Sequence, residues 1–358
     1  MGYMTRRTFV ELGAIAGGFA ALSGLAGCGS TSQASPASSA ASSFAESAES
    51  VESASSSSAS SSSASSAPAS SEAPQVYFTR ALDSAGLQAV FAAIGRELGS
   101  GKIGVKLSSG ELGGNHYLKG DLIADLVHAV GGAIVECNTA YGGGRSSIAA
   151  HYQVAADHGF NAIADFQIMD EAGSLSLPVV GGLHLSEDLV GAAFSDYDGF
   201  LVLSHFKGHM MAGFGGALKN ISIGMASREG KYLIHSAGAT SESWRSAATP
   251  DFLESIADAC KAVLAAQPNM LLVNVMNNLS VDCDCDSNPA PPKMADIGIL
   301  ASADPVALDQ ACVDLVYASE DDSADLIKHM ESRDGVHVLE AAESLGVGSR
   351  AYELVEIG

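Results

Sequence analysis

The strongest constraint on the fold of this chain is a regular alternation of short apolar runs with longer amphipathic segments after residue 75. Short runs rich in Val, Ile and Leu predict buried strands, and apolar positions repeating every three or four residues predict helices. The predicted strands are 102–107, 133–137, 199–203, 271–276 and 296–301. The predicted helices are 85–98, 121–130, 147–158, 251–266 and 305–317, the last capped by Asp304. This alternation predicts a three-layer α/β fold, with a mostly parallel or mixed central sheet and helices on both faces.

The N-terminal residues have the pattern of an export signal. Thr5–Val10 contains the paired arginines of a twin-arginine signal, and an apolar stretch follows. Leu25–Cys28 resembles a bacterial lipobox, which implies cleavage before Cys28 and a lipid on its sulfur. We therefore expect residues 1–27 to be a signal peptide and the protein to be exported by the twin-arginine route and anchored through Cys28 to the outer face of the cell membrane. The alternative is an uncleaved anchor helix.

Residues 28–75 form a low-complexity segment, almost entirely Ser and Ala with scattered glutamates. A segment this poor in large apolar residues buries too little surface to offset the entropy of ordering, so we expect a disordered tether. The remaining residues, 76–358, are rich in Ala, Gly, Val, Ile and Leu. They are enough for a single domain with a sizeable core.

The charge excludes one class of function. The chain has 18 basic and 41 acidic side chains, a formal net charge of −23. A field of this sign repels nucleic-acid phosphates, so nucleic-acid binding is not expected. Any partner that the acidic surface attracts should be a cation or a metal ion.

Polar segments follow four of the predicted strands, and the first three of them contain glycine. They are residues 108–116, 138–145, 204–220 and 277–286. Ligands in α/β sheets bind beyond the carboxyl ends of the strands, so we expect the four segments to converge on one cleft. The first offers Glu111 and His116 for proton transfer, and the second offers Asn138 and Arg145 for ligand binding. Each segment alone is also consistent with ordinary turn chemistry.

The segment 204–220 has the densest functional signal. Its two histidines and two lysines lie among glycines directly after a strand: His205, Lys207, His209 and Lys219. A strand, a glycine-rich loop and a helix beginning near Ala217 would expose backbone N–H groups and a helix dipole that favour an anion. We expect the anionic ligand to contact Gly215, Gly216, Lys219 and Asn220, and catalysis to use His205, Lys207 and His209. The alternative is that the histidines only hydrogen-bond loop carbonyls.

The cysteines give a second signal. Cys260 and Cys312 fall on apolar helix faces and are expected in the core. Cys283 and Cys285 are two residues apart in a loop, where an extended backbone would point both sulfurs to one side. They are candidates for metal ligands or reactive thiols. A disulfide formed after export and inert loop thiols are the alternatives.

Several motifs together resemble the domain of unknown function 362 family, whose members are often labelled iron–sulfur centre proteins. The resemblance covers nearly all of residues 77–358. The motifs that carry it are 102–106, Glu111 with Asn115, 204–220, 230–231 with His235, 283–285, 296–298 and 304–309. Many members carry ferredoxin-type cysteine runs after the equivalent of His235, and this chain has none there. A [4Fe–4S] cluster needs four thiolates, so the resemblance does not imply one here. The loop 213–219 is also similar to the glycine-rich loop and lysine of nickel-pincer lactate racemases.

These observations lead to two hypotheses. The first is an exported, lipid-anchored enzyme that uses a metal ion or a metal-containing cofactor of unknown identity on a small anionic substrate. Cys283 and Cys285 would be ligands together with His205 or His209, and Lys207 and Lys219 would hold the anion. The second is a non-catalytic surface lipoprotein that binds a metal ion or a small anion with the same residues.

Overall fold

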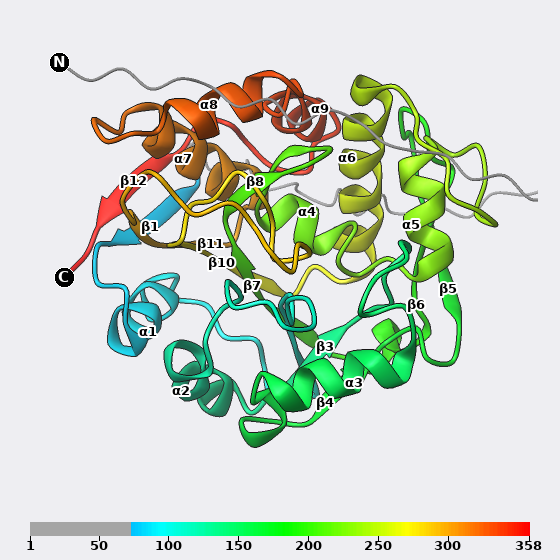
Figure 1. Ribbon diagram of the computed structural model, residues 1–358, viewed down its shortest axis with the longest axis horizontal. Helices are drawn as coiled ribbons and strands as arrows, with labels where there is room; N and C mark the ends of the chain where they lie inside the picture. The colour runs from blue at the N-terminus through cyan, green and yellow to red at the C-terminus, as the bar shows by residue number, and fades with distance from the viewer. Residues whose placement is uncertain (1–72) are drawn as a thin grey trace, which may run out of the picture. The chain divides into compact units, whose positions relative to one another are not determined.

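The central element is an eight-stranded sheet with the strand order β12-β1-β11-β10-β7-β2-β3-β4 (Figure 1). The computed structural model describes residues 73–358, so the predicted signal peptide, Cys28 and the tether up to residue 72 lie outside the described residues. The eight strands are β1 (Gln75–Thr79), β2 (Ile103–Lys106), β3 (Ala133–Glu136), β4 (Phe166–Ile168), β7 (Gly199–His205), β10 (Met270–Met276), β11 (Gly298–Ser302) and β12 (Glu353–Glu356). Only β11 runs antiparallel to its neighbours, so the sheet is mixed and mostly parallel.

Two hairpins lie outside this sheet. The first pairs β5 (Ser174–Pro178) with β6 (Glu187–Gly191), and the second pairs β8 (Lys207–His209) with β9 (Gly213–Gly215). The second hairpin occupies the segment predicted as a glycine-rich loop. The short helix α4 (Ala217–Ile221) follows it directly.

Helices cover both faces of the sheet. The other helices are α1 (Ser84–Ala93), α2 (Gly120–Val130), α3 (Ile148–Asp157), α5 (Arg228–His235), α6 (Thr249–Ala266), α7 (Pro305–Tyr317), α8 (Ala324–Glu331) and α9 (His337–Ser344), with 3₁₀ turns at Phe160–Ala162 and Ala192–Asp196. One core cluster joins alternate strand residues to α1 and α2, and the other joins the remaining strand residues to α4, α6, α7 and α9. In Figure 1 the first group of helices lies below the sheet and the second above it. The predicted three-layer α/β fold is therefore confirmed.

The predicted elements are all present, with one boundary error of more than two residues. The helix predicted to reach residue 98 ends at Ala93, because Gly95 adopts a left-handed backbone conformation with φ of 67°. Among residues 73–358, no helix is both long and apolar enough to cross a membrane.

The sheet topology brings the predicted site segments together. Strands β3, β2, β7 and β10 are consecutive neighbours and run parallel to one another. Their carboxyl ends therefore lie along one edge, and the four polar segments that follow them meet there.

Candidate functional site

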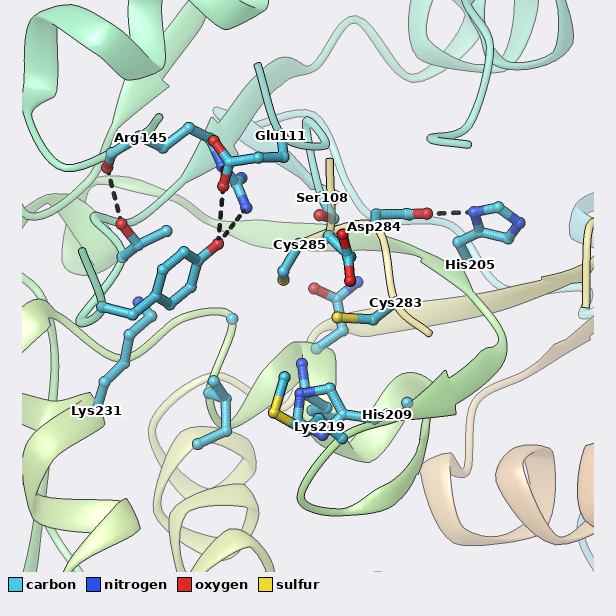
Figure 2. A pocket seen from close by; sticks show the side chains of 18 of the residues that line it. Ser108, Glu111, Arg145, His205, His209, Lys219, Lys231, Cys283, Asp284 and Cys285 are labelled. Atoms are coloured by element: carbon cyan, nitrogen blue, oxygen red, sulfur yellow. Dashed lines mark hydrogen bonds and ion pairs between the residues drawn. The ribbon is translucent and has the colours of Figure 1, made fainter. Parts of the chain in front are cut away.

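A cavity of about 520 Å³ lies at this edge of the sheet (Figure 2). Most of the residues singled out from the sequence line it: Glu111, Arg145, His205, Lys207, His209, Gly215, Gly216, Lys219, Asn220, Cys283 and Cys285. His116 and Asn138 are near the cavity wall in the fold but do not line the cavity. The four segments thus form one site, as the sequence indicates.

Asp284 organises the wall beside β7 as a buried charge cluster. Its carboxylate accepts a hydrogen bond from Lys207 Nζ at 2.8 Å and lies 3.1 Å from His205 Nδ1. The other ring nitrogen of His205 lies 2.7 Å from the Asn277 carbonyl oxygen, so both nitrogens are engaged. Burial raises the pKa of Asp284, but His205 and Lys207 outweigh it and bring that pKa to about 2.

This cluster corrects two expectations. Lys207 is 2 % exposed, and its ammonium group is bound to Asp284 and to the carbonyl oxygen of His116 at 3.2 Å. It is a structural cation and not a binder of free anions. His205 has no free ring nitrogen to offer a metal ion or a proton. Figure 2 shows His205 joined to Asp284 and apart from His209 and Lys219.

His116 is also not placed for the proton transfer predicted for it. Its carbonyl oxygen supports Lys207, and within the described part of the chain its buried Nδ1 has no hydrogen-bond partner. Burial and the neighbouring Lys207 lower the pKa of His116. Since it does not line the cavity, it has no route to a ligand there.

The predicted anion cradle at the start of α4 is already occupied by a side chain. The N–H groups of Ala217 and Leu218 donate to the carboxylate of Asp309 at 2.7 and 2.9 Å. Asp309 is fully buried and also accepts from Asn274 Nδ2 at 2.7 Å. The N-terminus of α4 is therefore satisfied internally, and the expectation that its N–H groups bind the ligand is wrong.

Lys219 differs from Lys207. It lies on α4 and lines the cavity, and no hydrogen bond or ion pair to its ammonium group is present within residues 73–358. Asn220, the next residue, is used by the fold: its Nδ2 donates to the Leu203 carbonyl oxygen at 3.1 Å and its Oδ1 accepts from Lys106 Nζ at 3.1 Å. Of this neighbouring pair, the lysine is the side chain that remains available to an anion.

Two cavity histidines have opposite hydrogen-bonding states. His209 Nδ1 accepts from the N–H of Ala212 at 3.0 Å, so its proton is on Nε2 and the ring offers a donor. His235 Nδ1 lies 2.6 Å from the Lys231 carbonyl oxygen and must donate to it, so its Nε2 offers a lone pair. Burial lowers the pKa of both rings, to about 4 for His235 and well below the ordinary value for His209, where Lys219 adds to the effect.

Cys283 and Cys285 both line the cavity and are free thiols. The neighbouring Cys283 thiol lowers the pKa of Cys285 to about 5, with Lys219 and Arg145 assisting against burial. The same pairing raises the pKa of Cys283. Figure 2 shows the two sulfur atoms above His209 and Lys219. The disulfide alternative is not what the described fold contains.

A complete protein cage for a metal ion is not assembled around this thiol pair. Within residues 73–358, His184, Asp251 and Glu254 form the group that could hold a metal ion, since one possible ligand atom of each lies within 4.8 Å of the others. That group is carried partly on α6, does not line the cavity, and has its own contact between His184 Nε2 and Glu254 at 2.5 Å.

Cys260 and Cys312 are buried in the core. Cys137 is buried at the cavity wall, where its thiol donates to the Met225 carbonyl oxygen at 3.2 Å. The four thiolates that a [4Fe–4S] cluster needs are therefore not assembled within residues 73–358.

Arg145 is held by two buried carboxylates. Its guanidinium group lies 3.6 Å from Glu111 and 3.5 Å from Glu136, and it donates to the hydroxyl group of Tyr141 at 3.0 Å. The Tyr141 hydroxyl in turn donates to Glu111 at 3.2 Å. A Cβ atom at Gly144 would lie 2.6 Å from Glu111 Oε1, so this position needs glycine. Arg145 mainly fixes Glu111, whose carboxylate faces the cavity.

Several cavity residues were not predicted from the sequence as site residues. They are Glu136, Tyr141 and Trp244, while Lys106, Lys231 and His235 were noted only in family motifs. Lys106 and Glu136 had a visible signal, since each is a charged residue inside an apolar strand. Burial lowers the pKa of Lys106 to about 8, opposed by Glu136. Asn138 is buried with its Oδ1 unpaired among the described residues, and its backbone N–H donates to Asp170.

Comparison with known families decides the classification. The family model "Domain of unknown function (DUF362)" matches residues 103–314, which is more than half of the chain. The chain belongs to this family. The match spans β2 to α7 and so includes all four site segments of this DUF362 protein.

Solved structures show only distant likenesses. The lactate racemase apoprotein from Thermoanaerobacterium thermosaccharolyticum matches with a TM-score of 0.37 and 9% identity, over 78% of this chain and 82% of that one. A protein from Thermotoga maritima matches with a TM-score of 0.36 and 12% identity, over 72% of this chain and 58% of that one. No match was found among curated proteins. At this level of similarity neither structure assigns a function to the chain.

Proposed function

We propose that this DUF362 protein is an enzyme that acts on a small anionic ligand with the help of a metal-containing cofactor held at the cavity. The observation that carries the proposal is the unpaired ammonium group of Lys219 in the cavity, while the ammonium group of Lys207 is neutralised by Asp284. In a protein of net charge −23, an unpaired cation in a partly enclosed site favours a negatively charged ligand.

The size of the cavity favours the enzyme over simple capture of an ion. A volume of 520 Å³ is within the range of about 300 to 1,000 Å³ found for sites of small organic molecules and cofactors. A metal ion or a lone small anion would leave most of it unfilled. The volume is suited to a substrate together with a cofactor.

The donor set fits a cofactor that brings ligands of its own better than it fits a bare metal ion. Cys283 and Cys285 offer two sulfur ligands, and His235 Nε2 offers a lone pair elsewhere on the wall, but these atoms do not form one tight group. Bare structural metal sites normally have four protein ligands. A metal held by the two sulfurs would supply a Lewis-acidic centre.

The remaining cavity residues can position the ligand and move a proton. Lys219 would pair with the anionic group, and the Nε2–H of His209 would donate a second hydrogen bond to it. Glu111 is oriented by Arg145 and Tyr141, so its carboxylate is the base that the cavity presents.

Export and anchoring are also part of the proposal, and they are supported by the sequence patterns at Thr5–Val10 and Leu25–Cys28. The Cys28→Ala variant should be released from the membrane fraction or remain unprocessed. Replacement of Arg6 and Arg7 by lysine should keep the protein in the cytoplasm. Mass spectrometry that finds an unmodified Cys28 in the mature protein would rule out the anchor.

Elemental analysis of the full chain purified after native export tests the cofactor. The wild type should contain a stoichiometric metal, and the Cys283→Ser, Cys285→Ser double variant should lose it. Asn288→Ala, an exposed change in the same loop that does not line the cavity, is the matched control. Metal-free wild type, or equal metal content in the double variant, would contradict the proposal.

A further inference from the structure

Three large apolar side chains at the cavity remain open to solvent. Tyr141 is 36 % exposed, Trp244 45 % and Met210 70 %, and all three line the cavity. They come from three separate segments: the loop after β3, the loop after α5 and the turn between β8 and β9. Exposed apolar side chains that gather around a concave site mark a binding surface more often than scattered ones do.

The surrounding structure anchors two of these side chains, and the backbone of the third, without burying them. The Tyr141 hydroxyl is fixed by Glu111 and Arg145, and the residue remains partly exposed. The Trp244 ring packs on His235 with centroids 4.5 Å apart. The backbone at Met210 is held because Arg333 Nε donates to its carbonyl oxygen. We call Tyr141, Met210 and Trp244 the apolar rim.

We infer that the apolar rim binds the hydrocarbon part of an amphipathic anion, whose acid group pairs with Lys219 in the same cavity. This inference rests on the proposed anion site and names the class of ligand for it. Two observations select the class: an unpaired cation on α4 and a set of partly exposed apolar side chains in one cavity of about 520 Å³. A short polar acid would use the cation and leave the rim exposed.

The single tryptophan makes the inference directly measurable. Trp244 is the one tryptophan of the chain, so its fluorescence reports on the rim alone. The full-length protein is titrated with straight-chain carboxylates from acetate to decanoate, and affinities are measured by calorimetry. We expect the dissociation constant to fall about two- to fourfold for each added methylene, because each buried methylene contributes up to about 0.8 kcal/mol. Trp244 emission should shift to shorter wavelength with the longer chains.

Variants distinguish the contribution of the hydrocarbon tail to the affinity from that of the acid group. Met210→Ser should weaken decanoate binding about three- to tenfold and leave acetate binding unchanged. Val180→Ser is the matched control, since Val180 is 76 % exposed but does not line the cavity. Lys219→Met should weaken every carboxylate in the series by a similar factor.

Three outcomes would overturn the inference. Equal affinity for acetate and decanoate, with both lost in Lys219→Met, would remove the apolar rim as a binding surface but leave the anion site intact. Decanoate binding that survives Lys219→Met would mean that the hydrocarbon chain binds without the cation. An equal loss of acetate and decanoate affinity in Met210→Ser would show that Met210 supports the fold of the site rather than the ligand.

Discussion

Lys207 and Lys219 lie in one glycine-rich segment, yet the fold uses them in opposite ways. Lys207 is buried against Asp284, and Lys219 faces the cavity without an ion-pair partner in the described chain. The two histidines of the segment divide in the same manner, since both nitrogens of His205 are engaged and His209 Nε2–H is available. Some polar residues of one sequence cluster therefore support the fold, and we call these residues the frame, while others form the ligand site. Partners that are distant in the sequence determine which role each residue has.

The comparison predicts its largest effect at Asp284. Asp284→Ala leaves Lys207 and His205 buried without their counter-charge, and removal of one partner from a buried ion pair costs about 3 to 5 kcal/mol. We expect a loss of this size in the free energy of unfolding measured with urea. Asn288→Ala, an exposed change in the same loop whose side chain makes no hydrogen bond within residues 73–358, should cost less than about 0.5 kcal/mol. Similar losses in the two variants would show that the buried cluster is not a frame.

Two adjacent glycines test the same difference between residues that support the fold and residues that bind the ligand. A Cβ atom at Gly216 would lie 2.3 Å from Asp309 Oδ1 and would displace the carboxylate that caps α4. Gly216→Ala should therefore lower the free energy of unfolding by about 1 to 3 kcal/mol. At Gly215 the nearest atom is the flexible Lys219 Cδ at 3.3 Å. Gly215→Ala should leave stability nearly unchanged and weaken anion binding, and the reverse pattern would contradict the assignment.

Acid should weaken the frame through Asp284. Its folded pKa of about 2 is below its ordinary value of 3.8, so its contribution to stability is present above pH 4 and is lost as the pH falls toward 2. The shift corresponds to about 2 kcal/mol. In urea unfolding, the stability difference between wild type and Asp284→Asn should shrink by about 1.5 kcal/mol between pH 4.5 and 2.5. A constant difference over that range would be inconsistent with a charged Asp284.

Local signals explain what the sequence could predict. The start of α7 follows from Asp304, whose Oδ1 accepts the N–H groups of Val306 and Ala307, and from Pro305 at the first helical position. The apolar runs predicted the strands at the centre of the sheet, because those strands are buried on both faces. The convergence of the four polar segments then followed from the parallel sheet.

Non-local pairings explain what could not be predicted. The edge strand β12 is mostly exposed, and its partner β1 lies at the other end of the described chain, so no alternation marked it. Asp284 meets Lys207 across 77 positions of sequence, and Asp309 reaches Ala217 across 92. These contacts turned two predicted ligand-binding features, Lys207 and the N-terminus of α4, into structural ones.

The most direct test of the central claim measures Lys219→Met and Lys207→Met side by side. Both substitutions remove a charge and keep the side chain long, so they form a matched pair. For Lys219→Met we expect affinity for a simple carboxylate such as butyrate to fall roughly ten- to a hundredfold, about 1.5 to 3 kcal/mol, with stability changed by less than about 0.5 kcal/mol. For Lys207→Met we expect a marked loss in the free energy of unfolding, because Asp284 is left buried and unpaired.

Calorimetric titration with butyrate and urea unfolding, made on the same preparations, give both quantities. The account predicts a crossed pattern: lost binding with intact stability at Lys219, and lost stability at Lys207. Intact binding with a marked drop in stability in Lys219→Met would contradict it, because Lys219 would then belong to the frame and the anion site would lie elsewhere.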